Sequence, residues 1–145
     1  MKTRSLTPWP AAAALALAGA AVLGAGLPPE QRAGGVTYVT GGVAADESAA
    51  FKQARADYPL TVQLVERAGA HNAYTANSRV KLVDTASGVV VLDAQADGPF
   101  MLVRLPSGNY RVEATLNGRT VQTKTVTVSS TGHTQVDLVF PQGTD

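Results

Sequence analysis

Apolar and polar residues alternate with a period of two from about residue 60 to residue 140, and this pattern constrains the fold more than any other feature. The alternation is clearest over 60–64 and 136–140, where Leu, Val or Phe stands at every second position. Successive side chains of a β-strand point to opposite faces of a sheet, so this period is typical of strands with one buried face. The region therefore predicts a β-rich domain.

Turn signals separate the alternating segments at intervals of roughly eight to fifteen residues. Asp97-Gly98-Pro99 is one of them. Asn117-Gly118 is the strongest hairpin signal, because both central residues of a type I′ turn take positive φ. Seven strands follow Pro59 in this interpretation. Their spacing favours an all-β fold, an antiparallel seven-stranded β-sandwich, over a parallel sheet with crossover helices.

Three stretches of this region depart from simple alternation. Residues 67–78 predict a long loop. Residues 89–92 are apolar on both faces, which predicts a strand in the interior of a sheet. In the strand 119–128, Val121 and the later valines stand on opposite phases. A bulge, or a passage from one sheet to the other, would reconcile the two phases.

The residues before the alternating region predict a short strand and a helix. Gln31–Gly35 is expected to be a linker. Val36–Thr40 is β-branched and aromatic, as in a strand, and Gly41-Gly42 would then turn the chain. Asp46 or a neighbour can accept hydrogen bonds from the first free amides of a helix. That helix should end before Pro59, because the residue preceding a proline disfavours helical geometry.

The N-terminus has the parts of a secretory signal peptide. Lys2 and Arg4 form a positively charged start, and every residue from Ala11 to Leu27 is Ala, Leu, Val or Gly. We predict a signal peptide over 1–27, cleaved between 20 and 33. The alternative is an uncleaved membrane anchor, but a span takes about 20 strongly apolar residues and this segment is rich in Ala and Gly. The mature product is expected to be periplasmic or secreted, with no stable membrane insertion.

Composition and charge exclude several classes of protein. The chain has no cysteine, which excludes a lipid anchor on cysteine and disulfides. Lys and Arg number 12, and Asp and Glu number 11. Removal of Lys2 and Arg4 leaves ten basic and eleven acidic residues, a formal charge of −1. The charges are scattered, whereas nucleic-acid binding needs a basic stripe, so no nucleic-acid partner is expected.

The mature chain is predicted to hold one domain. Residues 28–57 form a linker, a short strand and a helix, residues 58–140 form the β-sandwich, and residues 141–145 form a tail. About 110 residues suffice for one domain with a modest core.

Several motifs of the alternating region occur in the order found in a known family. They are Val80-Lys-Leu82-Val-Asp84, Gly88, Asp97-Gly98-Pro-Phe100, Leu105-Pro106-Ser-Gly108-Asn-Tyr110 and Val112. They resemble the Asp-x-x-Gly-x-Phe turn and the Leu-Pro-x-Gly-x-Tyr-x-Val strand of carboxypeptidase regulatory-like domains. The resemblance covers about residues 79–128. It implies a small transthyretin-like (prealbumin-like) β-sandwich in an exported protein.

The N-terminal part carries a second resemblance. Thr40-Gly41-Gly42-Val43, with Asp46-Glu47 and Tyr58, is similar to a group of short, uncharacterised proteobacterial periplasmic proteins that carry this domain. The family name refers to an accessory domain beside a zinc peptidase, not to the peptidase itself. The resemblance therefore implies a fold and a location, with an undetermined role.

The sequence offers no catalytic or metal-binding constellation. His71 and His133 are its only histidines, and both are interpreted as solvated loop residues. It has no Gly-x-Ser-x-Gly elbow and no reactive cysteine. It ends Phe140-Pro-Gln-Gly-Thr-Asp145, whereas transthyretin-like hydrolases of purine catabolism end in Tyr-Arg-Gly-Ser. We predict no enzyme, no metal and no cofactor, and a hydrolase of this fold is the least favoured alternative.

Two sets of residues are candidates for binding. Sugars stack on exposed aromatic rings, and because Trp9 leaves with the signal peptide, the candidate surface rings are Tyr38, Tyr58 and Tyr74. The second set consists of family-like turn residues, namely Gly41, Gly42, Asp97, Gly98 and Pro99. The leading hypothesis is a non-enzymatic exported module that binds an envelope protein or another envelope component. A carbohydrate-binding module, with a glycan as its partner, is the alternative.

Overall fold

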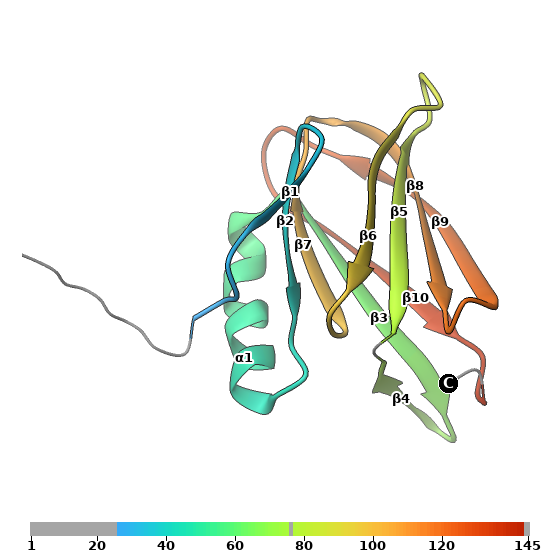
Figure 1. The fold of residues 1–145 in the computed structure, drawn as a ribbon. Helices are drawn as coiled ribbons and strands as arrows, with labels where there is room; N and C mark the ends of the chain where they lie inside the picture. The colour runs from blue at the N-terminus through green and yellow to red at the C-terminus, as the bar shows by residue number, and fades with distance from the viewer. Residues whose placement is uncertain (1–25, 76, 144–145) are drawn as a thin grey trace, which may run out of the picture.

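Two β-sheets face each other, and one helix covers the outer face of the first sheet (Figure 1). The computed structural model describes residues 26–75 and 77–143. The predicted signal peptide falls almost wholly on residues 1–25 and lies outside the described residues. No helix of the described part is long and apolar enough to cross a membrane.

Within the described residues, sheet A has six strands and sheet B has four. In sheet A the order is β1 (Gln31–Ala33), β2 (Val36–Gly41), β7 (Phe100–Arg104), β3 (Leu60–Ala68) and β10 (Thr134–Phe140), and β4 (His71–Tyr74) pairs with β3. In sheet B it is β6 (Val90–Ala96), β5 (Ser78–Asp84), β8 (Gly108–Leu116) and β9 (Thr120–Val128). Helix α1 (Ala45–Ala54) and a 3₁₀ turn (Arg55–Asp57) lie between β2 and β3.

The predicted β-sandwich is confirmed as a two-sheet, sandwich-like arrangement, but sheet A is mixed rather than antiparallel. β10 runs parallel to β3, from the pair Thr134–Leu60 to the pair Phe140–Glu66. The chain reaches β10 from β9, which lies in the opposite sheet. β10 begins at the end of sheet A where β3 also begins, and there the Thr134 amide donates a hydrogen bond to the Pro59 carbonyl at 3.0 Å. Alternation specifies which face of a strand is buried, but not which strand it pairs with. The parallel direction of β10 relative to β3 was therefore not predictable from the pattern.

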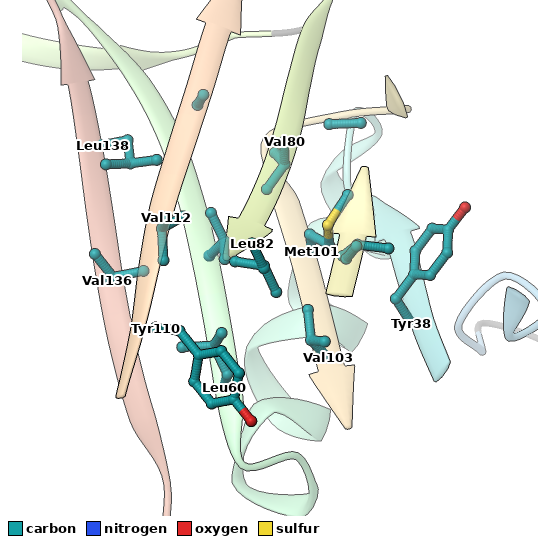
Figure 2. Close-up of a cluster of buried hydrophobic side chains, with 14 of the residues drawn as sticks. Tyr38, Leu60, Val80, Leu82, Met101, Val103, Tyr110, Val112, Val136 and Leu138 are labelled. Atoms are coloured by element: carbon teal, nitrogen blue, oxygen red, sulfur yellow. The ribbon is translucent and has the colours of Figure 1, made fainter. Parts of the chain in front are cut away.

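The main core fills the space between the sheets (Figure 2). It takes every second residue from strands of both sheets, as the period of two predicts. Leu82 and Val112 from sheet B and Leu60 and Leu138 from sheet A have no exposed surface. Burial of a large apolar side chain stabilises a fold by about 1.5–3 kcal/mol. The core therefore stabilises the two sheets as one unit.

β7 is a strand whose two faces are both buried. Met101 and Val103 point into the main core, whereas Phe100 and Leu102 belong to a second cluster with Phe51 of α1. The prediction that 89–92 lies in the interior of a sheet was wrong. β6 is an edge strand of sheet B, because among the described strands of that sheet it pairs with β5 alone, and Val89 and Val90 are 56% and 47% exposed.

Other local predictions were corrected in detail. The predicted loop 67–78 contains the end of β3 and the strand β4, and the predicted linker 31–35 contains β1. Eight strands of the described chain therefore follow Pro59, not seven. β9 pairs with β8 in unbroken register and has no bulge. Val121 simply faces solvent.

The predicted hairpin turn and helix are confirmed. Asn117 and Gly118 both have positive φ, 54° and 70°, and the Arg119 amide donates to the Leu116 carbonyl at 3.1 Å. The expected side-chain cap is not formed: the N-cap of α1 is Ala44, without a side-chain cap hydrogen bond, and the Asp46 carboxylate accepts from the Glu47 amide within the helix at 2.9 Å.

Candidate functional site

The structure brings most of the candidate binding residues to one end of sheet A. The two predicted turn segments, 41–42 and 97–99, meet where β2 ends and β7 begins. Tyr74, at the end of β4, lies beside them because β4 and β7 occupy successive stretches of the same edge of β3. The Leu64 amide of β3 donates to the Pro99 carbonyl at 2.8 Å. Three segments that are distant in sequence thus form one site.

The two turn segments contact each other through backbone. A Cβ atom added to Gly98 would lie 2.4 Å from the carbonyl oxygen of Gly41, so only glycine fits there. Thr40 strengthens the contact, because its hydroxyl donates to the Phe100 carbonyl at 3.0 Å and accepts from the Asp97 amide at 3.0 Å. Turn 97–99 is therefore held rigidly against the end of β2.

Helix α1 supplies the next part of the site. The carboxylate of Glu47 accepts a hydrogen bond from the Gly42 amide at 2.6 Å, which links the helix to the turn after β2. The ring of Phe51 stacks on Phe100 with centroids 5.7 Å apart. Tyr74 meets Phe100 edge-on at 5.2 Å, and the Lys52 ammonium lies 5.7 Å from the centre of the Tyr74 ring. An aromatic cluster with one adjacent cation results.

A pocket of about 160 Å³ opens beside this cluster and is called here the end pocket. It is lined by Gly42, Val43, Tyr74, Thr75 and Pro99. Val43 and Tyr74 are 71% and 46% exposed, so both are open to a partner. Pockets for drug-sized ligands usually measure about 300–1,000 Å³. The end pocket is therefore closer in size to a single side chain than to a whole small molecule.

Sequence reasoning missed part of this pocket. Thr75 lay inside the predicted loop, and Lys52 stands at a helix position that no periodic signal marks. Val43 belongs to the motif Thr40-Gly41-Gly42-Val43 but was not predicted to be a binding residue. Their proximity depends on how β4 joins β3, which the sequence pattern did not reveal.

The other two candidate rings were predicted to lie on the surface, and that prediction was wrong. Tyr38 belongs to the main core and Tyr58 to the cluster under α1. The Tyr58 hydroxyl donates to the Glu30 carboxylate at 2.6 Å, and the Arg104 guanidinium lies 4.1 Å from the centre of its ring. The hydrogen bond from Tyr58 lowers the pKa of Glu30, while burial and then that bond raise the pKa of Tyr58. These groups fasten the segment before β1 to the domain.

The two histidines lie at opposite ends of β3. His71 pairs with Ala68, and His133 immediately precedes Thr134, which pairs with Leu60. Eight residues of strand correspond to about 26 Å, so the two rings do not share a site. Both are exposed, but His71 lies in β4 rather than in a loop. Within the described residues, no three His, Asp or Glu side chains are grouped to hold a metal ion.

A second pocket, of about 320 Å³, lies on the side of the sandwich between the β1–β2 turn and β6. Gly34, Gly35 and Val36 line one wall, and Pro106 and residues 89–91 contribute the rest. Its surface is mainly valine and carries none of the candidate binding residues. It offers an apolar groove without a charged or aromatic side chain.

Comparison of the sequence with protein-family models gave no match, and comparison with curated proteins gave none either. The resemblance to carboxypeptidase regulatory-like domains therefore stays a prediction.

Proposed function

We propose that this chain is an exported, non-enzymatic module of the transthyretin-like β-sandwich class, and that it binds an envelope protein through the end pocket. The observation that carries the proposal is the small size of that pocket together with its lining. Val43, Tyr74 and Pro99 provide apolar and aromatic surface, and the Lys52 ammonium places one charge 5.7 Å from the centre of the Tyr74 ring. Tyrosine in a small pocket is a frequent anchor in protein–protein interfaces. Export rests on the sequence of residues 1–27, and the two-sheet arrangement supports the class.

A protein partner is favoured over a glycan by the number of exposed rings. A flat sugar platform uses several coplanar aromatic faces, whereas Tyr74 is the one exposed tyrosine of the four in this chain. Its ring also packs against Phe100 in a T-shaped arrangement. The carbohydrate-binding hypothesis is kept as the second candidate because Tyr74 still exposes part of its ring.

Site-specific photo-cross-linking tests this proposal. A photoreactive residue replaces Val43 in the chain without residues 1–27, and a matched control carries it at Val121, which is 52% exposed on sheet B. Irradiation in envelope extract is expected to give a protease-sensitive adduct from position 43 that position 121 does not give. Identical adduct patterns at both positions would refute the proposed site. An adduct that resists protease but is removed by glycan-degrading enzymes would favour the second candidate.

A further inference from the structure

We infer that the partner is bound as an extended polypeptide segment that adds a strand to the open edge of β4. One apolar side chain of that segment would occupy the end pocket, and an acidic side chain would lie beside Lys52. This inference rests on the proposed function and names the chemical form of the partner.

β4 has an edge with unused hydrogen-bonding groups. The Thr75 amide donates to the Leu64 carbonyl at 3.3 Å, and Ala73 is paired with Glu66. In an antiparallel ladder the backbone groups of successive residues point alternately to the two sides. Those of Asn72 and Tyr74 therefore point away from β3. No described residue forms a backbone hydrogen bond with them on that side.

The open edge exists because β2 stops too early to cover β4. β2 pairs with β7 as far as the pair Gly41–Phe100, and the chain then leaves the sheet through Gly42 toward α1. β4 continues along β3 beyond the start of β7. The position next to β4, in line with β2, thus holds no strand of the described chain.

The end pocket lies at this vacant strand position. Gly42 and Val43 line it from the side of β2, and Tyr74 and Thr75 line it from the side of β4. Tyr74 turns its side chain toward Phe100 and Lys52, on the helix-covered face of sheet A. Side chains of an added strand alternate between faces, so every second one would meet this face. A volume of about 160 Å³ suits one of them.

Charge specifies a second feature of the segment. Lys52 forms no ion pair with any described residue, and its ammonium lies over the ring of Tyr74. A carboxylate of the partner would be attracted to this cation. We therefore expect an apolar residue with an acidic residue near it in the segment.

Selection from a library of linear peptides displayed on phage provides the probe. The most enriched peptides are synthesised, and their affinities for the chain without residues 1–27 are measured by calorimetry. Asn72→Pro removes an amide that points to the open edge and leaves the β3–β4 bonds in place, which is the arrangement in which edge strands tolerate proline. Asn72→Ala is the matched control, because it removes the same side chain and keeps the amide.

The inference predicts that Asn72→Ala binds the peptides like the wild type and that Asn72→Pro binds about tenfold more weakly. Lys52→Glu should weaken the binding of acidic peptides by about two- to fivefold. Equal affinity of the proline and alanine variants would overturn the inference. If Asn72→Pro does not fold, peptides N-methylated at single positions replace it. Methylation should then weaken binding at alternate positions only, and an effect without alternation would overturn the inference.

The remaining outcomes separate this inference from the proposed function. Failure to enrich any linear peptide overturns strand addition, and the cross-link from position 43 would still stand. Peptides that bind both Asn72 variants equally but not Val43→Asp would overturn strand addition and support the end pocket. A dimer of the chain that Asn72→Pro dissociates would make a second copy the occupant, and would overturn the inference as stated.

Discussion

Gly98→Ala is expected to destabilise the domain at the junction of its two turn segments. The added Cβ would lie 2.4 Å from the Gly41 oxygen and 2.5 Å from the Gly41 carbonyl carbon. Both atoms belong to backbone, which cannot rotate away as the end of a side chain could. β2 and turn 97–99 would have to separate by about 0.6 Å to reach even a 3.0 Å contact.

The magnitude follows from the cost of overpacking. Insertion of one methyl group into a well-packed position typically costs about 1–3 kcal/mol. The hydrogen bonds of Thr40 resist the separation, because they link Asp97 and Phe100 to β2. For a domain of this size, a loss of 1 kcal/mol lowers Tm by about 4 °C. We therefore expect Tm to fall by roughly 4–12 °C.

Thermal unfolding followed by circular dichroism measures this effect. Gly35→Ala is the matched control, because an added Cβ there meets no atom within 4 Å and the backbone is not in the left-handed region. Its stability should be unchanged or higher by up to about 1 kcal/mol. A Gly98→Ala variant with the same Tm as Gly35→Ala would refute the reasoning that backbone contact at Gly98 requires glycine.

Three further predictions concern the helix, the N-terminal segment and β9. Phe51→Ala should lower the free energy of unfolding by about 3–5 kcal/mol in urea titrations, because Phe51 is fully buried and stacked on Phe100; a loss below 1 kcal/mol would contradict it. The hydrogen bond from Tyr58 lowers the pKa of Glu30 in the folded protein. The ionised Glu30 carboxylate therefore stabilises the fold above its unfolded pKa of 4.5, and this stabilisation is lost as pH falls below that pKa. Glu30→Gln should therefore have a lower urea midpoint than the wild type at pH 7, with a gap that closes on acidification, and a constant gap would contradict this. Val121→Thr should change the unfolding free energy by less than about 0.5 kcal/mol, because Val121 is 52% exposed, and a larger loss would indicate burial in solution.

The turn segments of the candidate site were predictable from the sequence, but the exposure of its tyrosine rings was not. Gly41-Gly42 and Asp97-Gly98-Pro99 were found from turn chemistry, since glycine and proline restrict the local backbone whatever surrounds it. The exposure of a tyrosine has no such local cause. Tyr38, Tyr58 and Tyr74 are chemically alike, and only the packing of neighbouring strands and α1 buries the first two.

The fold was predictable in its buried faces for a similar reason. Val136, Leu138 and Phe140 alternate and are all buried, because the side-chain period of a strand is set by backbone geometry. Val89 to Leu92 show the limit of this argument. Their apolar character is the same in an interior strand and in an edge strand that lines a groove, so the pattern could not distinguish the two.

The sequence by itself determined most of the strands with their buried faces, the helix and the tight turns, because each depends on residues within a few positions of one another, but it did not reveal β1 or β4. Only the tertiary structure decided that β10 runs parallel to β3, that β7 rather than 89–92 is buried on both faces, and that β4 extends beyond β2. These features depend on which segments meet after the chain has crossed between the sheets. Which segments pair with one another depends on the packing energy of the whole core and on contacts between residues far apart in the chain, and no local sequence pattern records these.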